Sequence, residues 1–231
     1  MDEIKDENIS RVIRVIRSSR RTLSLEVTRD GIVVVRAPSF LSTVKIQNFV
    51  AEKKSWIEKK RSLVKNHLAS KKIFRYVPGE EYSFLGVNYP LIFVDKKKPN
   101  LVLTDRFEMA ASKRKHAPQI FLRWYKERAL LVISDLVKQY ATRNQLVYRK
   151  IGISSARTRW GSCNSRGHLS FSWRLIMAPE KVVTYVVVHE LAHLMHHNHS
   201  KRFWRFVEKM MPGYKTQRRW LKEHGHTLVL D

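Results

Sequence analysis

The stretch H-E-L-A-H-L-M-H-H-N-H-S, residues His189–Ser200, contains five of the ten histidines in the 231-residue chain. It begins with the pattern H-E-x-x-H. In a helix, residues four apart project from one face, so His189 and His193 can bind one zinc ion while Glu190 beside them handles a proton. The preceding valine-rich residues indicate a helix that is buried on nearly every side. Unpaired polar side chains are costly on such a helix, so the stretch predicts a metal centre.

A catalytic zinc ion needs a third protein ligand and one open position. His196 and His197 continue the helical face of the first two histidines. However, a helix rises about 1.5 Å per residue, which puts His197 ~6 Å beyond His193 and ~12 Å beyond His189. Zinc–nitrogen bonds are only about 2 Å long, so three ligands cannot meet from one straight helix.

The chain must therefore turn before it supplies the third ligand. Asn198 tolerates the left-handed conformation that ends many helices, and Ser200 can cap a following helix. His199 lies between them, ten residues after His189, which is the spacing of the metzincin pattern H-E-x-x-H-x-x-G-x-x-H. We expect His199 to be the third ligand, and Glu208 on the next helix is the alternative.

Hydrophobic periodicity and turn residues predict an α+β fold for the whole chain. The expected helices cover 43–66 and 119–143, and a third begins at Pro179-Glu180. The expected strands form a hairpin over 23–35 with a turn at Asp30-Gly31 and an end at Pro38, a second hairpin over 81–94, and single strands at 101–104, 148–153, 156–162 and 168–172. A turn is expected at 164–167, and loops at 95–99 and 111–117.

The composition describes a strongly basic protein. Lysine and arginine total 45 against 20 acidic residues, a net charge of +25, and such a surface attracts nucleic acid and other polyanions. No helix-turn-helix, RNP or zinc-finger pattern accompanies the charge, so it also fits a solvated basic surface without a dedicated partner. The apolar runs are too short to span a bilayer. A polar, acidic start and the single Cys163 favour a cytoplasmic location.

Several motifs together resemble the YgjP-like family of predicted zinc metallopeptidases. They are Arg159-Trp160-Gly161-Ser162-Cys163, the returning strand, Pro179, the H-E-x-x-H pattern, Asn198-His199-Ser200 with Phe203-Trp204, Pro38 after its hairpin, and Trp56-Ile57. The resemblance covers most of the chain, and is weak over 95–118. The chain is more distantly similar to SprT-like proteases that act on DNA–protein crosslinks. The resemblance implies a zincin-type fold and one zinc ion held by His189, His193 and His199, with Glu190 as catalytic acid and base.

We therefore expect an N-terminal α+β region of hairpins and a helix at 1–112, followed by a zincin-like metallopeptidase domain at 113–231. In the expected reaction, Glu190 takes a proton from zinc-bound water as it attacks a peptide carbonyl, and then delivers it to the leaving amine. Either strand 156–162 or strand 168–172 is expected to border the cleft and to pair with an extended peptide.

Other residues near the motif have weaker claims to a role. Arg157, Arg159 and Tyr214 are candidates for stabilising the oxyanion, although each is also explained by structure or by the basic surface. Cys163 is expected to be an inert thiol. Two further functions stay open: a nucleic-acid-associated protease acting on DNA- or RNA-bound proteins, and a non-catalytic, zinc-stabilised binding module. The oligomeric state and the substrate are not predicted.

Overall fold

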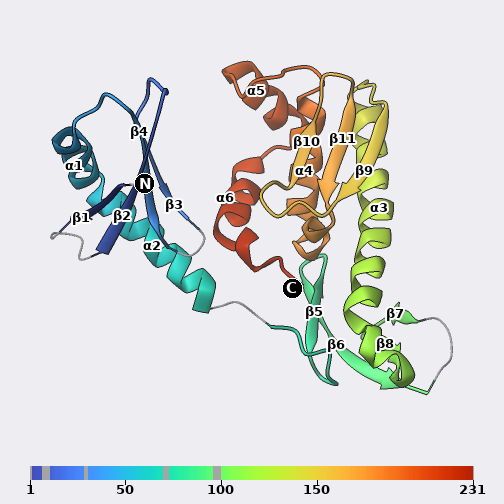
Figure 1. Cartoon of the computed structure of the whole chain (residues 1–231). Coiled ribbons are helices and arrows are strands. Elements are labelled where there is room, and N and C mark those ends of the chain that lie inside the picture. The colour runs from blue at the N-terminus through green and yellow to red at the C-terminus, as the bar shows by residue number, and fades with distance from the viewer. Residues whose placement is uncertain (1, 7–10, 29–30, 70–72, 96–99, 231) are drawn as a thin grey trace. The chain divides into compact units, whose positions relative to one another are not determined.

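The computed structural model describes residues 2–6, 11–28, 31–69, 73–95 and 100–230. The chain has an α+β fold with two compact units, Met1–Lys71 and Lys72–Asp231 (Figure 1). Within the described ranges, no helix combines the length and the apolar character that a membrane span requires.

The first unit is a four-stranded sheet packed against two helices. Its elements are β1 (Asp2–Asp6), β2 (Arg11–Ser18), β3 (Ser24–Val27), β4 (Val33–Pro38), α1 (Thr43–Glu52) and α2 (Lys54–Ala69), with the strands in the order β1-β2-β4-β3. Strands β3 and β4 form the first predicted hairpin, which ends at Pro38 as expected. Gly31 of its turn has φ 81°, and Asp30 lies outside the described residues.

The single helix predicted over 43–66 is in fact two helices, with a break at Lys53. Ile46 and Val50 of α1 and Ile57 of α2 are buried in one core with the strands. A helix continuing from Val50 would bring Lys53 or Lys54 onto the same face, three or four residues on. With the break, both lysines are exposed while Ile57 lies in the core.

The second unit contains two sheets and the longest helix. One sheet has the order β5-β6-β8-β7 and the other the order β10-β11-β9. The elements are β5 (Glu81–Phe84), β6 (Val87–Val94), β7 (Leu101–Leu103), β8 (Phe107–Ala110), α3 (Ala117–Arg143), β9 (Lys150–Ser154), β10 (Gly161–Cys163), β11 (His168–Ser172), α4 (Glu180–Ala192), α5 (Lys201–Met210) and α6 (Tyr214–His224), with 3-10 turns at Ala111–His116, Trp173–Met177 and Gly225–Thr227.

The division between the units differs from the expected boundary at 112/113. Tyr82 of β5 and Phe107 of β8 have ring centroids 4.3 Å and 5.2 Å from Phe121 of α3. All three side chains are almost fully buried in the core of the second unit. The strands between 81 and 110 therefore share a core with α3 instead of forming a region with the N-terminal sheet. Residues 111–116, expected as a loop, form a 3-10 turn that leads into α3.

Helix α4, which carries the H-E-x-x-H pattern, is the most enclosed helix of the second unit. Ten of its 13 residues are buried, as its valines predicted. Its start is held by the turn between β5 and β6. There, the backbone N–H of Leu85 donates to the carbonyl of Ile176 at 2.8 Å, and a Cβ added to Gly86 would lie 2.8 Å from Cα of Pro179.

The three-stranded sheet lies beside α4 and α3 (Figure 1). Strand β11 is central, antiparallel to β10 and parallel to β9. The strand predicted over 156–162 is mostly absent, and side chains from the following segment bind the carbonyl groups at and just before its start. Ser172 donates to the carbonyl of Ala156 at 2.8 Å, and Arg174 donates to that of Ser155 at 3.0 Å. Only its last residues pair, as β10.

Candidate metal centre

The predicted ligands lie where α4 ends and the following loop begins. His193 caps the C-terminus of α4. The backbone N–H groups of Leu194 and Met195 bond to carbonyls three residues back, which tightens the last turn and ends the helix. The prediction that Asn198 ends the helix in a left-handed conformation is wrong, because its φ is not positive. This tightening of the last turn ends the helix without a left-handed residue.

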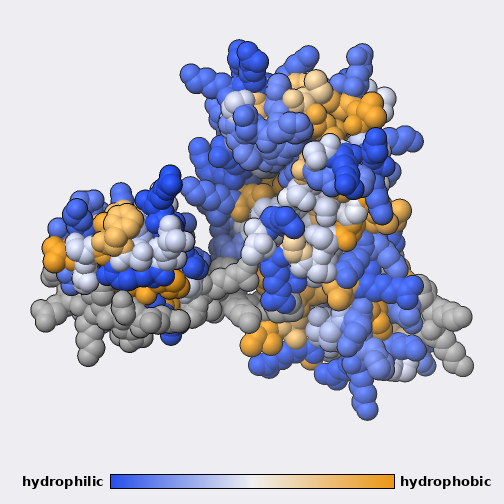
Figure 2. Space-filling model, turned by 45° about the horizontal axis from the view of Figure 1, so that its top comes forward, coloured by the Kyte–Doolittle hydropathy of each residue, from blue (hydrophilic) through white to orange (hydrophobic). Residues whose placement is uncertain are grey.

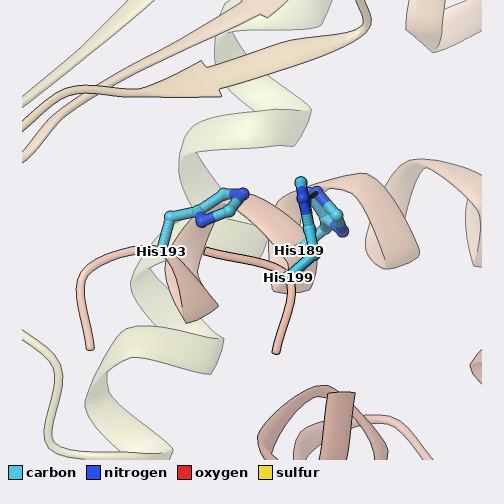
Figure 3. Close-up of side chains that lie close together, drawn as sticks. All are labelled: His189, His193 and His199. Atoms are coloured by element: carbon cyan, nitrogen blue, oxygen red, sulfur yellow. Dashed lines mark hydrogen bonds between the residues drawn. The ribbon is translucent and has the colours of Figure 1, made fainter. Parts of the chain in front are cut away.

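Three of the five clustered histidines meet. One ring nitrogen from each of His189, His193 and His199 lies within 4.8 Å of the others. Nε2 of His189 and Nε2 of His199 are 3.0 Å apart, and the three ring centroids are separated by 4.8–5.0 Å. Figure 3 shows His189 and His199 side by side, with the ring of His193 turned toward them. The spacing of ten residues between the first and last histidine thus places them together.

Helix α5 supplies the packing that holds these rings in place. Ser200 caps α5 as predicted, and its hydroxyl accepts a hydrogen bond from the N–H of Phe203. The buried ring of Phe203 lies 4.6–5.0 Å from the centroids of all three imidazoles. Trp204 stacks on His199 with a centroid distance of 5.6 Å and an interplanar angle of 22°. The third histidine, although on a loop, is therefore braced by two aromatic rings.

The environment of His189 and His193 favours their neutral form. Burial, and then the positive charges that His193, His199 and Arg218 can carry, lower the pKa of His189 from 6.5 to about 3. The pKa of His193 is also lowered, mainly by burial. Neutral imidazoles keep the lone pairs that a metal ion needs.

The remaining two histidines of the stretch stay outside the triad. His196 contributes its backbone carbonyl, which lies 3.0 Å from Nδ1 of His193. If that nitrogen carries the proton, Nε2 of His193 presents its lone pair to the triad. The ring of His196 packs on Phe206 at 5.8 Å instead, and His197 is exposed.

Glu190 is buried between α4 and the sheet. Its side chain is 6% exposed, and burial raises its pKa from 4.5 to about 7 although nearby Arg159 lowers it. A Cβ added to Gly161 of β10 would lie 2.6 Å from both Cγ and Oε1 of Glu190. The missing side chain at Gly161 is therefore what allows the carboxyl group to rest against β10. Sequence reasoning missed this contact, although Gly161 stands in one of the quoted motifs.

The other residues named from the sequence take different positions. Glu208 is exposed, and its carboxylate accepts a hydrogen bond from the N–H of Gly213 at 3.2 Å; it is not part of the triad. Tyr214 is buried and stacks on Trp204 at 5.4 Å. Burial, and then the charge of Glu190, raise the pKa of the Cys163 thiol, which disfavours the reactive thiolate.

Arg157 and Arg159 lie in the segment between β9 and β10. The positive charge of Arg159 lowers the pKa of Glu190. The pKa of the buried Arg174 is lowered mainly by burial, and to a smaller extent by the positive charge of Arg157. Of the two arginines, Arg159 is therefore the one whose charge reaches the buried carboxyl group.

An H-E-x-x-H helix, a third histidine from the next loop and a buried glutamate against a sheet edge together define a metallopeptidase-type centre. The family model described as YgjP-like, metallopeptidase domain, matches residues 21–224. The chain belongs to this family, and it is a metallopeptidase.

One solved structure is similar to part of the chain, the metallopeptidase zymogen abylysin of Pyrococcus abyssi. The two sequences are 24% identical, and the match covers 39% of this chain and 93% of the abylysin chain with a TM-score of 0.36. No curated protein matches the chain.

Proposed function

We propose that this metallopeptidase binds one zinc ion per chain through His189, His193 and His199, and hydrolyses peptide bonds with Glu190 as general base and acid. The observation that carries the proposal is the meeting of three imidazoles next to a buried carboxyl group. A site with three protein ligands leaves a fourth position open, which distinguishes a catalytic zinc site from a structural one.

The donor set fits zinc. Imidazole is a preferred zinc ligand, and two nitrogens bound at about 2.0–2.1 Å in tetrahedral geometry lie about 3.3 Å apart. The 3.0 Å between Nε2 of His189 and Nε2 of His199 is close to that spacing. The carbonyl of His196 next to Nδ1 of His193 is the kind of outer partner that orients a zinc-bound histidine.

When bound, zinc supplies Lewis acidity and lowers the pKa of a water molecule. Glu190 then takes a proton from the attacking water and passes it to the leaving amine. Burial raises the pKa of Glu190, which makes its carboxylate a stronger base for the proton of water. A buried carboxyl group also excludes competing water from its own surface, which strengthens its hydrogen bonds.

We infer that the substrate is an extended peptide that pairs with β10. Of the two strands that sequence reasoning left open, β11 is central and β10 lies at the edge of the sheet. Gly161 of β10 touches Glu190, so a peptide added to this edge would pass next to the carboxyl group.

The basic composition favours a second property, nonspecific binding to nucleic acid. The net charge is +25, and on the face drawn in Figure 2 hydrophilic side chains predominate, interspersed with smaller hydrophobic areas. Such binding would bring the enzyme to DNA- or RNA-bound proteins, and it depends on the number of phosphates neutralised rather than on base sequence.

Replacing Glu190 with glutamine tests the proposed chemistry. Glu190→Gln keeps the shape of the side chain and all three histidines, so zinc content should stay at one per chain. Hydrolysis of an internally quenched peptide should fall by roughly 10²–10⁴-fold, the usual worth of a general base. The exposed Glu208→Gln is the matched control and should keep full activity. Zinc-dependent hydrolysis that survives in Glu190→Gln would remove the assigned base, and zinc binding without hydrolysis in the wild type would favour a binding module.

A further inference from the structure

Arg218 of α6 lies beside the metal centre on an aromatic wall formed by Tyr185, Trp204 and Tyr214. Its guanidinium carbon is 4.4 Å from the ring centroid of Trp204, the same ring that stacks on His199. Tyr214 stacks on Trp204 at 5.4 Å and on Tyr185 at 6.0 Å, with interplanar angles of 9° and 15°. A single indole ring thus links the guanidinium to an imidazole of the triad.

The positive charge of Arg218 reaches the centre. It is among the causes that lower the pKa of His189, after burial and the two other histidines, and it counteracts the effect of burial on the pKa values of Tyr185 and Tyr214. The geometry agrees, since the ring centroid of Trp204, over which the guanidinium lies, is 5.7 Å from that of His189 and 5.6 Å from that of His199.

Within the part of the chain that the structure describes, no acidic group pairs with Arg218. Elsewhere in the described chain, arginines pair with carboxylates, as Arg123 does with Glu127 at 2.8 Å and Arg36 with Glu26 at 3.6 Å. Arg218 is exposed and, within the described residues, has no ion pair or hydrogen bond. Since Glu208 bonds to the N–H of Gly213, the acidic residue closest in sequence on α5 is already engaged.

We propose that Arg218 is a specificity-determining residue that receives a carboxylate of the substrate, so that the enzyme prefers peptides with an acidic residue near the scissile bond. The inference rests on the proposed peptidase function. The contact with Trp204 positions the guanidinium without using any of its N–H donors in a hydrogen bond, and these donors form the fork that matches a carboxylate. The packed indole also limits the rotamers of Arg218, so little freedom is lost on binding.

A paired set of peptides tests the preference. Zinc-loaded enzyme is given internally quenched decapeptides with a single aspartate at each of six central positions, and the same peptides with asparagine. We expect at least one aspartate peptide to be cleaved with roughly threefold to tenfold higher kcat/KM than its asparagine partner, as a partly exposed charge-assisted hydrogen bond allows. Arg218→Gln should cleave the aspartate and asparagine peptides equally well. Arg218→Glu should instead prefer a peptide with lysine at the same position.

The controls separate recognition from structure. Arg219→Gln changes the neighbouring exposed arginine, about 100° further around α6, and should keep the preference. Arg218→Gln should bind zinc normally and cleave the asparagine peptides within about twofold of the wild type. If Arg218→Gln instead slows both members of each pair equally, Arg218 only supports Trp204 and the proposal is overturned. Equal rates for all pairs in the wild type overturn it too.

Binding to Glu190→Gln distinguishes failure of this inference from failure of the proposed function. The affinities of the same peptides for Glu190→Gln and for Glu190→Gln with Arg218→Gln are measured by fluorescence anisotropy. If the aspartate peptides bind more tightly than the asparagine peptides only when Arg218 is present, and the wild-type enzyme cleaves none of them, acid recognition is supported and the peptidase mechanism is refuted. Absence of any discrimination in binding, with cleavage intact in the parent, would refute the role of Arg218 alone.

Discussion

Gly161→Ala would displace the carboxyl group of Glu190, the proposed base, without changing any of the three proposed metal ligands. The added Cβ would lie 2.6 Å from Cγ and Oε1 of Glu190 and 2.9 Å from its Cδ. Ordinary contacts of a Cβ begin at about 3.4 Å, so the overlap is about 0.8 Å, a distance that packed interiors cannot absorb freely. Glu190 must move, because Gly161 belongs to a strand paired with β11.

The size of the effect follows from that overlap. Overpacking a buried site costs about 1–3 kcal/mol of folding free energy, which lowers the melting temperature of a unit of this size by about 2–10 °C. A displacement of about 1 Å of a catalytic group costs roughly a hundredfold in rate. We therefore expect kcat/KM of Gly161→Ala to fall about a hundredfold, while the affinity for zinc stays within about threefold of the wild type.

The assay compares peptide hydrolysis, zinc content and thermal unfolding of Gly161→Ala with those of Gly152→Ala. Gly152 lies in β9 of the same sheet, and a Cβ added there meets no atom within 4 Å, so its variant should behave like the wild type. Glu190→Asp shortens the side chain and should cost less activity in the Gly161→Ala background than in the wild type. Full activity of Gly161→Ala would show that the carboxyl group against β10 is not the catalytic one.

Three further measurements test the site and the surface. His199→Ala should weaken zinc binding by more than roughly a hundredfold, and Glu208→Ala should weaken it by less than threefold. Competition with a chelating dye measures both affinities. If Glu208→Ala has the larger effect instead, the glutamate is the third ligand. Arg159→Gln should move the acidic limb of the pH dependence of kcat/KM to higher pH, because the arginine favours the ionised form of Glu190 and activity needs that form. If the limb does not move, a group other than Glu190 titrates there. The logarithm of the affinity for duplex DNA should fall with the logarithm of the salt concentration, with a slope of about −0.9 per phosphate neutralised. Glu190→Gln should bind DNA as tightly as the wild type. A weaker complex in that variant would place nucleic acid at the active site.

The elements that could be predicted from the sequence carry strong local signals. Alternating apolar residues on both sides of a turn predicted the β3–β4 and β5–β6 hairpins, and a wide apolar face predicted α3 to within two residues at its start. The valine-rich run before His189 predicted a fully packed α4. In each case neighbouring residues alone determine the pattern, so no knowledge of the tertiary contacts was needed.

The elements that were missed depend on contacts between distant residues. In β2, Ile13 and Val15 are buried and Arg14 is exposed, a short alternation that becomes a strand only because β4 pairs alongside it. Residues 156–160 are not a strand, and the carbonyl groups of Ala156 and of the preceding Ser155 accept hydrogen bonds from the side chains of Ser172 and Arg174. The domain division, too, depends on which aromatic side chains find a common core.

The candidate site shows the same contrast. The spacing of His189, His193 and His199 in the sequence placed the triad, since a helix and one turn leave few other arrangements. The contact between Gly161 and Glu190 joins residues 29 positions apart, and the position of Arg218 depends on Tyr185 of α4 and Trp204 of α5 as well as on Tyr214 of its own helix. Such contacts leave no periodic trace in the sequence, although the glycine in the R-W-G run marks one of them.

Burial shifts the pKa values of His189 and of Glu190 in opposite directions, and a bound metal ion would reconcile the two. It lowers the pKa of His189 to about 3, so without metal the stability that this group contributes is present above pH 6.5 and lost as the pH falls. It raises the pKa of Glu190 to about 7, so the contribution of that group is present below pH 4.5 and lost as the pH rises through 7. A metal ion needs the neutral imidazoles that burial already provides. Its charge would also favour the carboxylate that burial opposes, and would so prepare Glu190 for its proposed role as the base.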